Sequence, residues 1–193
     1  MTADAGSGEP GRVVVTWLPA TDADDRAIAR AAAEFAGVGA AEIRIVRACR
    51  SCGSDQHGKP YVLGPRATVH ASLSRAGHLA VVAVSDAGPI GVDLEEAGVR
   101  ATTTPPSEVD IETWVRKESL LKATGHGLMV DPDSIEVTPP GQSPALVSWS
   151  AIEPLDGPAW MLSLECHDGF VGVVTVLAPA RPLLLAPAAA PED

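Results

Sequence analysis

Short stretches in which apolar and polar residues alternate, or in which β-branched residues cluster, recur along the chain. Both patterns are typical of β-strands rather than of long helices. In residues 42–47, for example, Ile43 and Ile45 fall on one face and Glu42 and Arg44 on the other. On this basis strands are predicted at residues 13–18, 42–47, 69–74, 79–85, 90–95, 135–138, 145–149, 160–166 and 170–177.

Two segments carry the signals of helix ends instead. Thr21 or Asp22 can cap a helix that runs to about Ala36, where Gly37 supplies the stop. Ser107-Glu108-Val109-Asp110 matches a capping box, so a second helix is predicted from about residue 108 to 124, ended by two glycines at 125 and 127.

The order of these elements repeats: a strand, a helix and then antiparallel strands occur twice. This order favours an α+β fold made of two similar lobes, at residues 12–88 and 89–178. The repeat lies in element order alone, because the two halves share no obvious residue pattern. Residues 1–11 are expected to be disordered, and the Pro/Ala-rich residues 179–193 are expected to form a flexible tail.

Composition excludes several classes of function. The 193-residue chain is 46% hydrophobic, enough for a sizeable core, and its net charge of −11 argues against general nucleic-acid binding. It has no run of 18 apolar residues and no signal-peptide pattern at its start, so neither a membrane span nor secretion is expected. Three cysteines do not form a disulfide scaffold, which favours the reducing cytoplasm.

The richest chemistry lies in Ile90-Gly91-Val92-Asp93-Leu94-Glu95-Glu96. On a strand, Asp93 and Glu95 project to the same face, and two neighbouring carboxylates repel each other unless a cation lies between them. A divalent metal site is one interpretation, and a solvated strand end is the other.

A second group lies on the later predicted helix. Trp114, Glu118 and Lys122 are spaced four residues apart and so form one stripe, with Lys117 on the adjacent stripe. A surface Glu–Lys pair is the simpler interpretation of Glu118 and Lys122. A tryptophan on the same stripe, followed by two glycines, favours a functional face.

A polar loop at residues 49–60 contains Cys49, Cys52 and His57, which could be three ligands of a zinc site. A fourth ligand is not evident, although Asp55 or His70 could reach. A loop with free thiols is the favoured interpretation.

Four motifs in order resemble those of the 4′-phosphopantetheinyl transferases, and in particular the Sfp-type, single-chain group. They are Gly58-Lys59-Pro60-Tyr61, Ser72-Leu73-Ser74-Arg75-Ala76-Gly77, Ile90-Gly91-Val92-Asp93-Leu94-Glu95, and Trp114-Val115-Arg116-Lys117-Glu118 continuing to Gly127-Leu128. The resemblance covers roughly residues 26–137. It implies two lobes related by a pseudo-two-fold axis, in a chain that is sufficient as a monomer.

The resemblance also implies a reaction. Such enzymes transfer 4′-phosphopantetheine from coenzyme A to a serine of a carrier protein in fatty-acid, polyketide or nonribosomal-peptide synthesis, releasing 3′,5′-ADP. Asp93, Glu95 and Glu118 would hold Mg²⁺, with Glu118 as general base and Lys122 stabilising the phosphates. Contacts to coenzyme A are implied for Lys59, Ser74, Arg75, Lys117 and Arg26.

Two departures from the family pattern leave an alternative open. The additional basic helix that family members carry before residue 24 has no counterpart, so Arg26, Arg30 and Arg75 would have to replace it. The segment at residues 97–113, which would help to dock the carrier protein, is short. A relative that binds coenzyme A or a carrier without turnover is therefore the second hypothesis. A carrier-binding basic patch, in either case, would draw on Arg75, Arg116, Lys117 and Lys122.

Overall fold

The computed structural model of the protein describes residues 9–64, 68–97, 110–166 and 169–185. Within these ranges lie two α-helices, α1 (Asp25–Ala36) and α2 (Ile111–Thr124), and eleven strands. The strands are β1 (Arg12–Pro19), β2 (Arg44–Ala48), β3 (Lys59–Leu63), β4 (His70–Ala76), β5 (Leu79–Ser85), β6 (Ile90–Glu96), β7 (Ile135–Val137), β8 (Leu146–Trp149), β9 (Ala159–Ser163), β10 (Phe170–Leu177) and β11 (Leu183–Leu184). A mixed fold with mostly strands and few helices agrees with the predicted α+β class.

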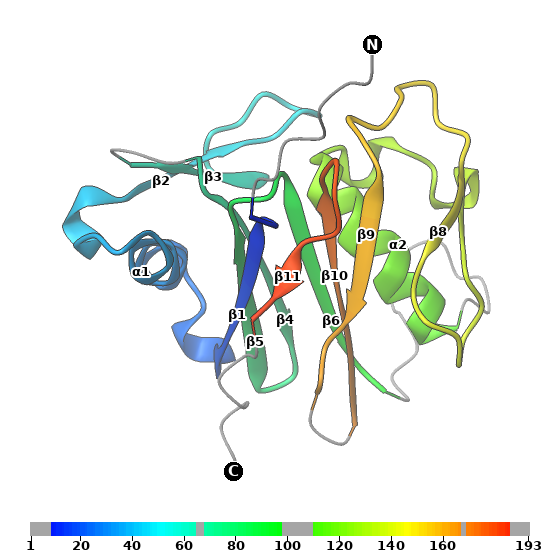
Figure 1. Ribbon diagram of the computed structural model, residues 1–193, viewed down its shortest axis with the longest axis horizontal. Helices are drawn as coiled ribbons and strands as arrows, with labels where there is room; N and C mark the ends of the chain where they lie inside the picture. The colour runs from blue at the N-terminus through cyan, green and yellow to red at the C-terminus, as the bar shows by residue number, and fades with distance from the viewer. Residues whose placement is uncertain (1–8, 65–67, 98–109, 167–168, 186–193) are drawn as a thin grey trace.

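The strands form two main sheets between two helices. One sheet has the order β11-β1-β5-β4-β3-β2, a second has the order β6-β10-β9, and β7 pairs with β8. Figure 1 shows α1 and α2 on opposite sides of the molecule, with the sheets between them. The protein is therefore layered as helix, sheet, sheet and helix.

The sequence of β5 explains why it lies in the middle of this arrangement. All seven of its residues are buried, and its side chains alternate between two cores. Val81 and Ala83 pack toward β6 and β10, whereas Val82 and Val84 pack under α1 with Ile28. A third core lies between α2 and the other face of the β6–β10 sheet.

The first helix begins later than the sequence predicts. Residues Ala20–Asp22 form a separate 3-10 turn, and Asp24 is the N-cap, accepting hydrogen bonds from the backbone N–H groups of Arg26 and Ala27. The predicted stop is confirmed, because Gly37 adopts a left-handed conformation with φ 68°.

The second helix also begins later than predicted, at Ile111, with Asp110 as its N-cap. The rest of the predicted capping box, at residues 107–109, lies outside the described residues. The predicted end is confirmed, because Gly125 is the left-handed C-cap.

Two strands were not expected from the sequence. β3 begins at Lys59, within the segment predicted as a loop, and pairs with β2 so that Arg47 lies opposite Pro60. β11 lies in the segment for which a flexible tail is expected, and it pairs in parallel with Arg12 and Val13 of β1. The first sheet thus includes residues beyond the predicted 12–88 lobe.

Candidate functional site

The position of α2 on β6 depends on Gly91. A Cβ atom at this position would lie 2.0 Å from the carbonyl oxygen of Ser119 and 2.3 Å from the backbone nitrogen of Ala123. Only glycine allows the helix backbone to approach the strand so closely. The Ser119 hydroxyl lies 2.7 Å from the Thr175 hydroxyl of β10, which fixes the rotation of the helix. Glu118 and Lys122 are thereby held against the strand that carries Asp93 and Glu95.

Asp93 is the buried centre of this region, with 2% of its surface exposed. Its Oδ1 accepts hydrogen bonds from the Ser74 hydroxyl at 3.0 Å and from the Lys122 ammonium at 2.5 Å. The Lys122 ammonium also donates to the Ser74 hydroxyl, at 3.0 Å. Oδ2 of Asp93 is buried and has no hydrogen-bond partner among the described residues. Because a buried carboxylate oxygen without a partner is costly, Oδ2 is suited to bind a further cation.

A cavity of about 340 Å³ opens beside Asp93. Its lining combines acidic, basic and aromatic side chains from both halves of the chain: Leu73, Ser74, Arg75, Asp93, Glu95, Trp114, Glu118 and Lys122. The same-face pair predicted on the strand and the stripe predicted on the helix therefore meet at one cavity.

The acidic side chains of the cavity destabilise one another's charges. Burial raises the pKa of Glu95, and the Asp93 carboxylate adds to this effect. Burial also raises the pKa of Glu118, although the Lys122 ammonium opposes it. A cation between these groups would relieve both the desolvation and the repulsion.

The donor set fits Mg²⁺ in kind, since carboxylate oxygens are the ligands that this ion prefers. However, the carboxylate oxygens of Asp93, Glu95 and Glu118 do not all lie within 4.8 Å of one another, as the ligands of one ion would. Among the described residues, the one group of three ligand atoms within 4.8 Å of one another belongs to Cys49, Cys52 and His57. At Asp93 the Lys122 ammonium provides the neutralising charge.

A larger cavity, of about 700 Å³, adjoins the first one. Leu73, Arg75, Glu118 and Lys122 line both, so the two cavities are neighbours. The larger cavity adds three further basic residues, Arg47, Arg50 and Lys59, and apolar side chains such as Leu121 and Met129. A ligand with both phosphates and an apolar portion would suit such a lining.

Lys59, expected to contact the nucleotide, has a structural role in this arrangement. Its ammonium donates to the carbonyl oxygens of Ile90, Lys122 and Ala123 at 3.2, 2.7 and 2.5 Å. Burial and the charge of Arg50 lower its pKa to about 8. These three bonds employ every N–H of the ammonium and bind β3 to the C-terminal end of α2.

The other predicted contacts to coenzyme A divide into two groups. Ser74 and Arg75 line the acidic cavity, and Arg75 is exposed. Lys117 donates to the carbonyl of Pro132 at 2.8 Å, and Arg26 is an exposed residue of α1. Within the described part of the chain, neither Lys117 nor Arg26 lines either cavity.

Two arginines that the sequence analysis did not select line the larger cavity instead. Arg47 donates to the Gly58 carbonyl and to Asp25, and Arg50 lies 2.9 Å from Nε2 of His126. The available signal was their closeness to Cys49, since Arg47 precedes it by two residues and Arg50 directly follows it. Neither arginine was assigned a role from the sequence.

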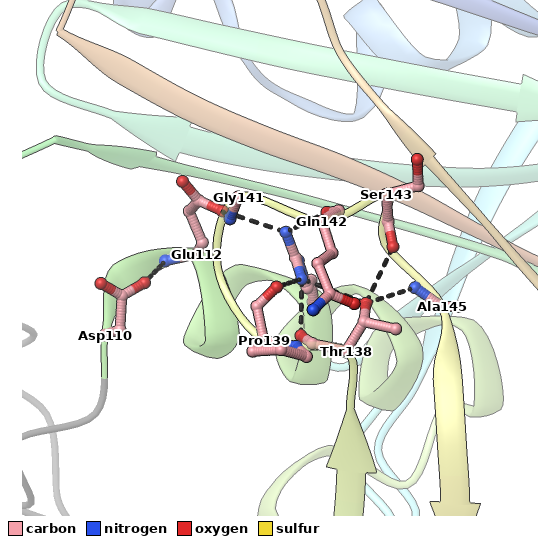
Figure 2. Close-up of polar contacts among 9 residues, drawn as sticks. Asp110, Glu112, Thr138, Pro139, Gly141, Gln142, Ser143 and Ala145 are labelled. Atoms are coloured by element: carbon pink, nitrogen blue, oxygen red, sulfur yellow. Dashed lines mark hydrogen bonds and ion pairs between the residues drawn. The ribbon is translucent and has the colours of Figure 1, made fainter.

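Arg116 does not contribute to a basic surface patch, contrary to expectation. It is 4% exposed, and its guanidinium donates to the carbonyl oxygens of Thr138, Pro139 and Gln142 and to the Glu112 carboxylate. Figure 2 shows how these carbonyls converge from the loop that follows β7. The guanidinium fixes this loop against α2, so its charge is not available to a partner.

A comparison with known families gives a match to the part of the chain that carries the carboxylates. Residues 89–165 match the model of the 4′-phosphopantetheinyl transferase superfamily. This segment contains Asp93, Glu95, Glu118 and Lys122, and its match points to phosphopantetheine transfer in general. The first half of the chain, with Lys59, Ser74 and Arg75, lies outside the matched segment.

The search of curated proteins gave no significant match. In the described residues, neither helix has the length and apolar character that a membrane crossing requires.

Proposed function

We propose that the protein transfers 4′-phosphopantetheine from coenzyme A to a serine of an acyl or peptidyl carrier protein, in a reaction that depends on Mg²⁺. The observation that carries this proposal is the acidic cavity built from Asp93, Glu95, Glu118 and Lys122, within a segment that matches the superfamily. The adjoining larger cavity, with its arginines, supports binding of the nucleotide end of coenzyme A. Two pseudo-symmetric lobes of the Sfp type are also proposed, since the element order β-α-β occurs in both halves.

The reaction breaks the phosphoanhydride bond of the pyrophosphate in coenzyme A and forms a phosphoester bond to the serine. The serine oxygen attacks the phosphorus that carries pantetheine, and the bond from this phosphorus to the oxygen of the adenylate phosphate breaks. The serine proton passes to the Glu118 carboxylate, directly or through a water. Because burial raises its pKa, Glu118 is a better base than an exposed glutamate.

Lys122 is proposed to turn from Asp93 toward the phosphates of the bound substrate. Its ammonium would stabilise the negative charge that collects on the departing 3′,5′-ADP. Mg²⁺, held by Asp93, Glu95 and Glu118, would neutralise the pyrophosphate. Oδ2 of Asp93 is the oxygen best placed to contribute, since it lacks a partner within the described structure.

A binding protein without turnover is the second candidate. The separation of the three carboxylates and the direct Lys122–Asp93 contact favour it, because a site fixed in this arrangement would not coordinate a metal. The two candidates differ in whether a carrier protein is modified.

Intact-mass spectrometry of purified apo carrier proteins tests the proposal. Carriers from fatty-acid, polyketide and nonribosomal-peptide systems are incubated with the protein, coenzyme A and Mg²⁺. A gain of one phosphopantetheine that EDTA abolishes is expected. If no carrier gains mass while calorimetry shows binding of coenzyme A, the enzyme proposal fails and the binding role is supported.

A further inference from the structure

The loop between β2 and β3 folds so that its two cysteines and one histidine converge. Gly53 takes a left-handed conformation with φ 73°, and its N–H donates to the carbonyl of Cys49 at 2.8 Å. The N–H of Cys49 in turn donates to the carbonyl of Ser54 at 2.9 Å. These bonds close a tight turn around the Cys-x-x-Cys segment, which brings both sulfur atoms to the same side.

His57 completes the cluster. Its Nε2 lies 3.3 Å from Sγ of Cys52, and the three potential ligand atoms of Cys49, Cys52 and His57 all lie within 4.8 Å of one another. All three cysteines of the chain are free of disulfides. Backbone N–H groups of Cys52 and Ser51 lower the pKa of the Cys49 thiol, which favours the thiolate.

We propose that Cys49, Cys52 and His57 bind a Zn²⁺ ion. Two thiolates and one imidazole are the ligands that zinc prefers, and the hard cations of the carboxylate site do not favour sulfur. On binding, the two thiols lose their protons to solvent, and His57 coordinates as a neutral imidazole through Nε2. Cys52 and His57 are exposed, so a water molecule completes the fourth position.

The location of this cluster suggests what the ion does. Cys49 lines the larger cavity, and Arg47 and Arg50 on either side of it line the same cavity. Lys59, which binds the end of α2, follows His57 by two residues. An ion that joins Cys49 to His57 would close the loop at its two ends. The basic side chains would then be fixed at the cavity wall.

The inference does not depend on the proposed transferase activity, because it rests on a separate set of residues. Metal content is the appropriate measurement. The full-length protein is stripped with a chelator under reducing conditions and titrated with Zn²⁺ against a chromophoric competitor. One ion per chain is expected, and Co²⁺ in its place should give the charge-transfer absorption of a thiolate ligand.

Matched variants separate this site from any other. Cys52→Ser and His57→Gln should each weaken zinc binding at least about tenfold, since each removes a ligand. Cys166→Ser removes the third cysteine, which is not part of the cluster, and should leave the affinity unchanged. Glu118→Gln should also retain zinc, so that loss of transfer and loss of zinc are distinguishable.

Several results would overturn the proposal. The wild-type protein could fail to bind zinc although thiol titration shows Cys49 and Cys52 reduced. Its affinity could be the same in the Cys52→Ser variant, which would indicate an adventitious ion. A Cys49–Cys52 disulfide that persists in protein isolated under mild reduction would assign the pair to redox chemistry instead. Circular dichroism of each variant checks that it is folded.

Discussion

The Lys122 ammonium lies 2.5 Å from Oδ1 of Asp93, and Ser74 hydrogen-bonds to both groups. This contact joins α2 to β6 and, through Ser74, to the first half of the chain. A metal at this site would compete with Lys122 for the Asp93 carboxylate, because the ammonium already neutralises its charge. In the proposed reaction the contact would therefore govern both metal binding and the position of the ammonium during transfer.

Replacing Lys122 with methionine should separate these two effects. Mg²⁺ should bind more tightly to Lys122→Met, because the competing positive charge is gone. Transfer should fall by about 100-fold or more, because the phosphates lose a charged donor. Calorimetry measures the first effect and single-turnover mass spectrometry the second. Arg44→Met, at an exposed position of β2, is the control for loss of one charge. Weaker Mg²⁺ binding by Lys122→Met would contradict this interpretation of the contact.

Gly91→Ala should destabilise the protein, because the added methyl group would overlap the backbone of α2 at Ser119 and Ala123. Displacing a packed helix costs on the order of 3 kcal/mol or more of the free energy of unfolding. Gly39→Ala is the matched control, since the added atom would be 3.3 Å from the flexible end of Glu42. Urea denaturation of both variants gives the comparison. Equal midpoints would show that α2 does not depend on glycine at position 91.

Arg116→Met should lower the free energy of unfolding by about 3 kcal/mol, because it removes a buried guanidinium and leaves three carbonyls of the 138–142 loop and the Glu112 carboxylate without its hydrogen bonds. Hydrogen exchange should increase in that loop. Arg44→Met, again exposed, should change stability little. If Arg116→Met instead kept its stability and weakened carrier binding, Arg116 would belong to the docking surface expected from the sequence.

Burial raises the pKa of the Cys166 thiol to about 11. Since the thiolate is the reactive form, its alkylation at pH 8 should be slow and should accelerate about tenfold for each pH unit up to that pKa. The folded state holds this proton more tightly than the unfolded state, so this group's contribution to stability declines between pH 9 and 11. Peptide mapping after timed alkylation measures the rate. Labelling of Cys166 as fast as that of a free peptide thiol at pH 8 would contradict its burial.

The sequence predicts those parts of the fold that depend on local pattern. The strand at residues 79–85 and the strand at residues 170–177 have the predicted bounds, because continuous apolar and β-branched runs define them. The predicted N-cap of α1, Thr21 or Asp22, was wrong, because Asp24 is an equally good capping residue. Only the separate turn at Ala20–Asp22 selects Asp24.

The candidate site likewise contains residues that local spacing predicts and residues whose roles depend on distant contacts. Asp93 and Glu95, two residues apart on a strand, and Glu118 and Lys122, four apart on a helix, meet because periodicity puts each pair on one face. The roles of Lys59 and Arg116 depend on contacts with segments far away in the chain. Local spacing does not tell which distant carbonyls will accept hydrogen bonds from a buried cation. Lys59 and Arg116 were therefore expected at the surface of the site.

We propose that the carboxylates around Asp93 perform Mg²⁺-dependent transfer. The rate at which Glu118→Gln modifies an apo carrier that the wild-type protein modifies tests this proposal. The matched control is Glu136→Gln, an exposed glutamate of β7. We predict that Glu118→Gln loses transfer by at least about 100-fold while remaining folded, because it removes both the base and a metal ligand. We predict a rate equal to wild type for Glu136→Gln. A Glu118→Gln variant that modified the carrier at nearly the wild-type rate would contradict the account.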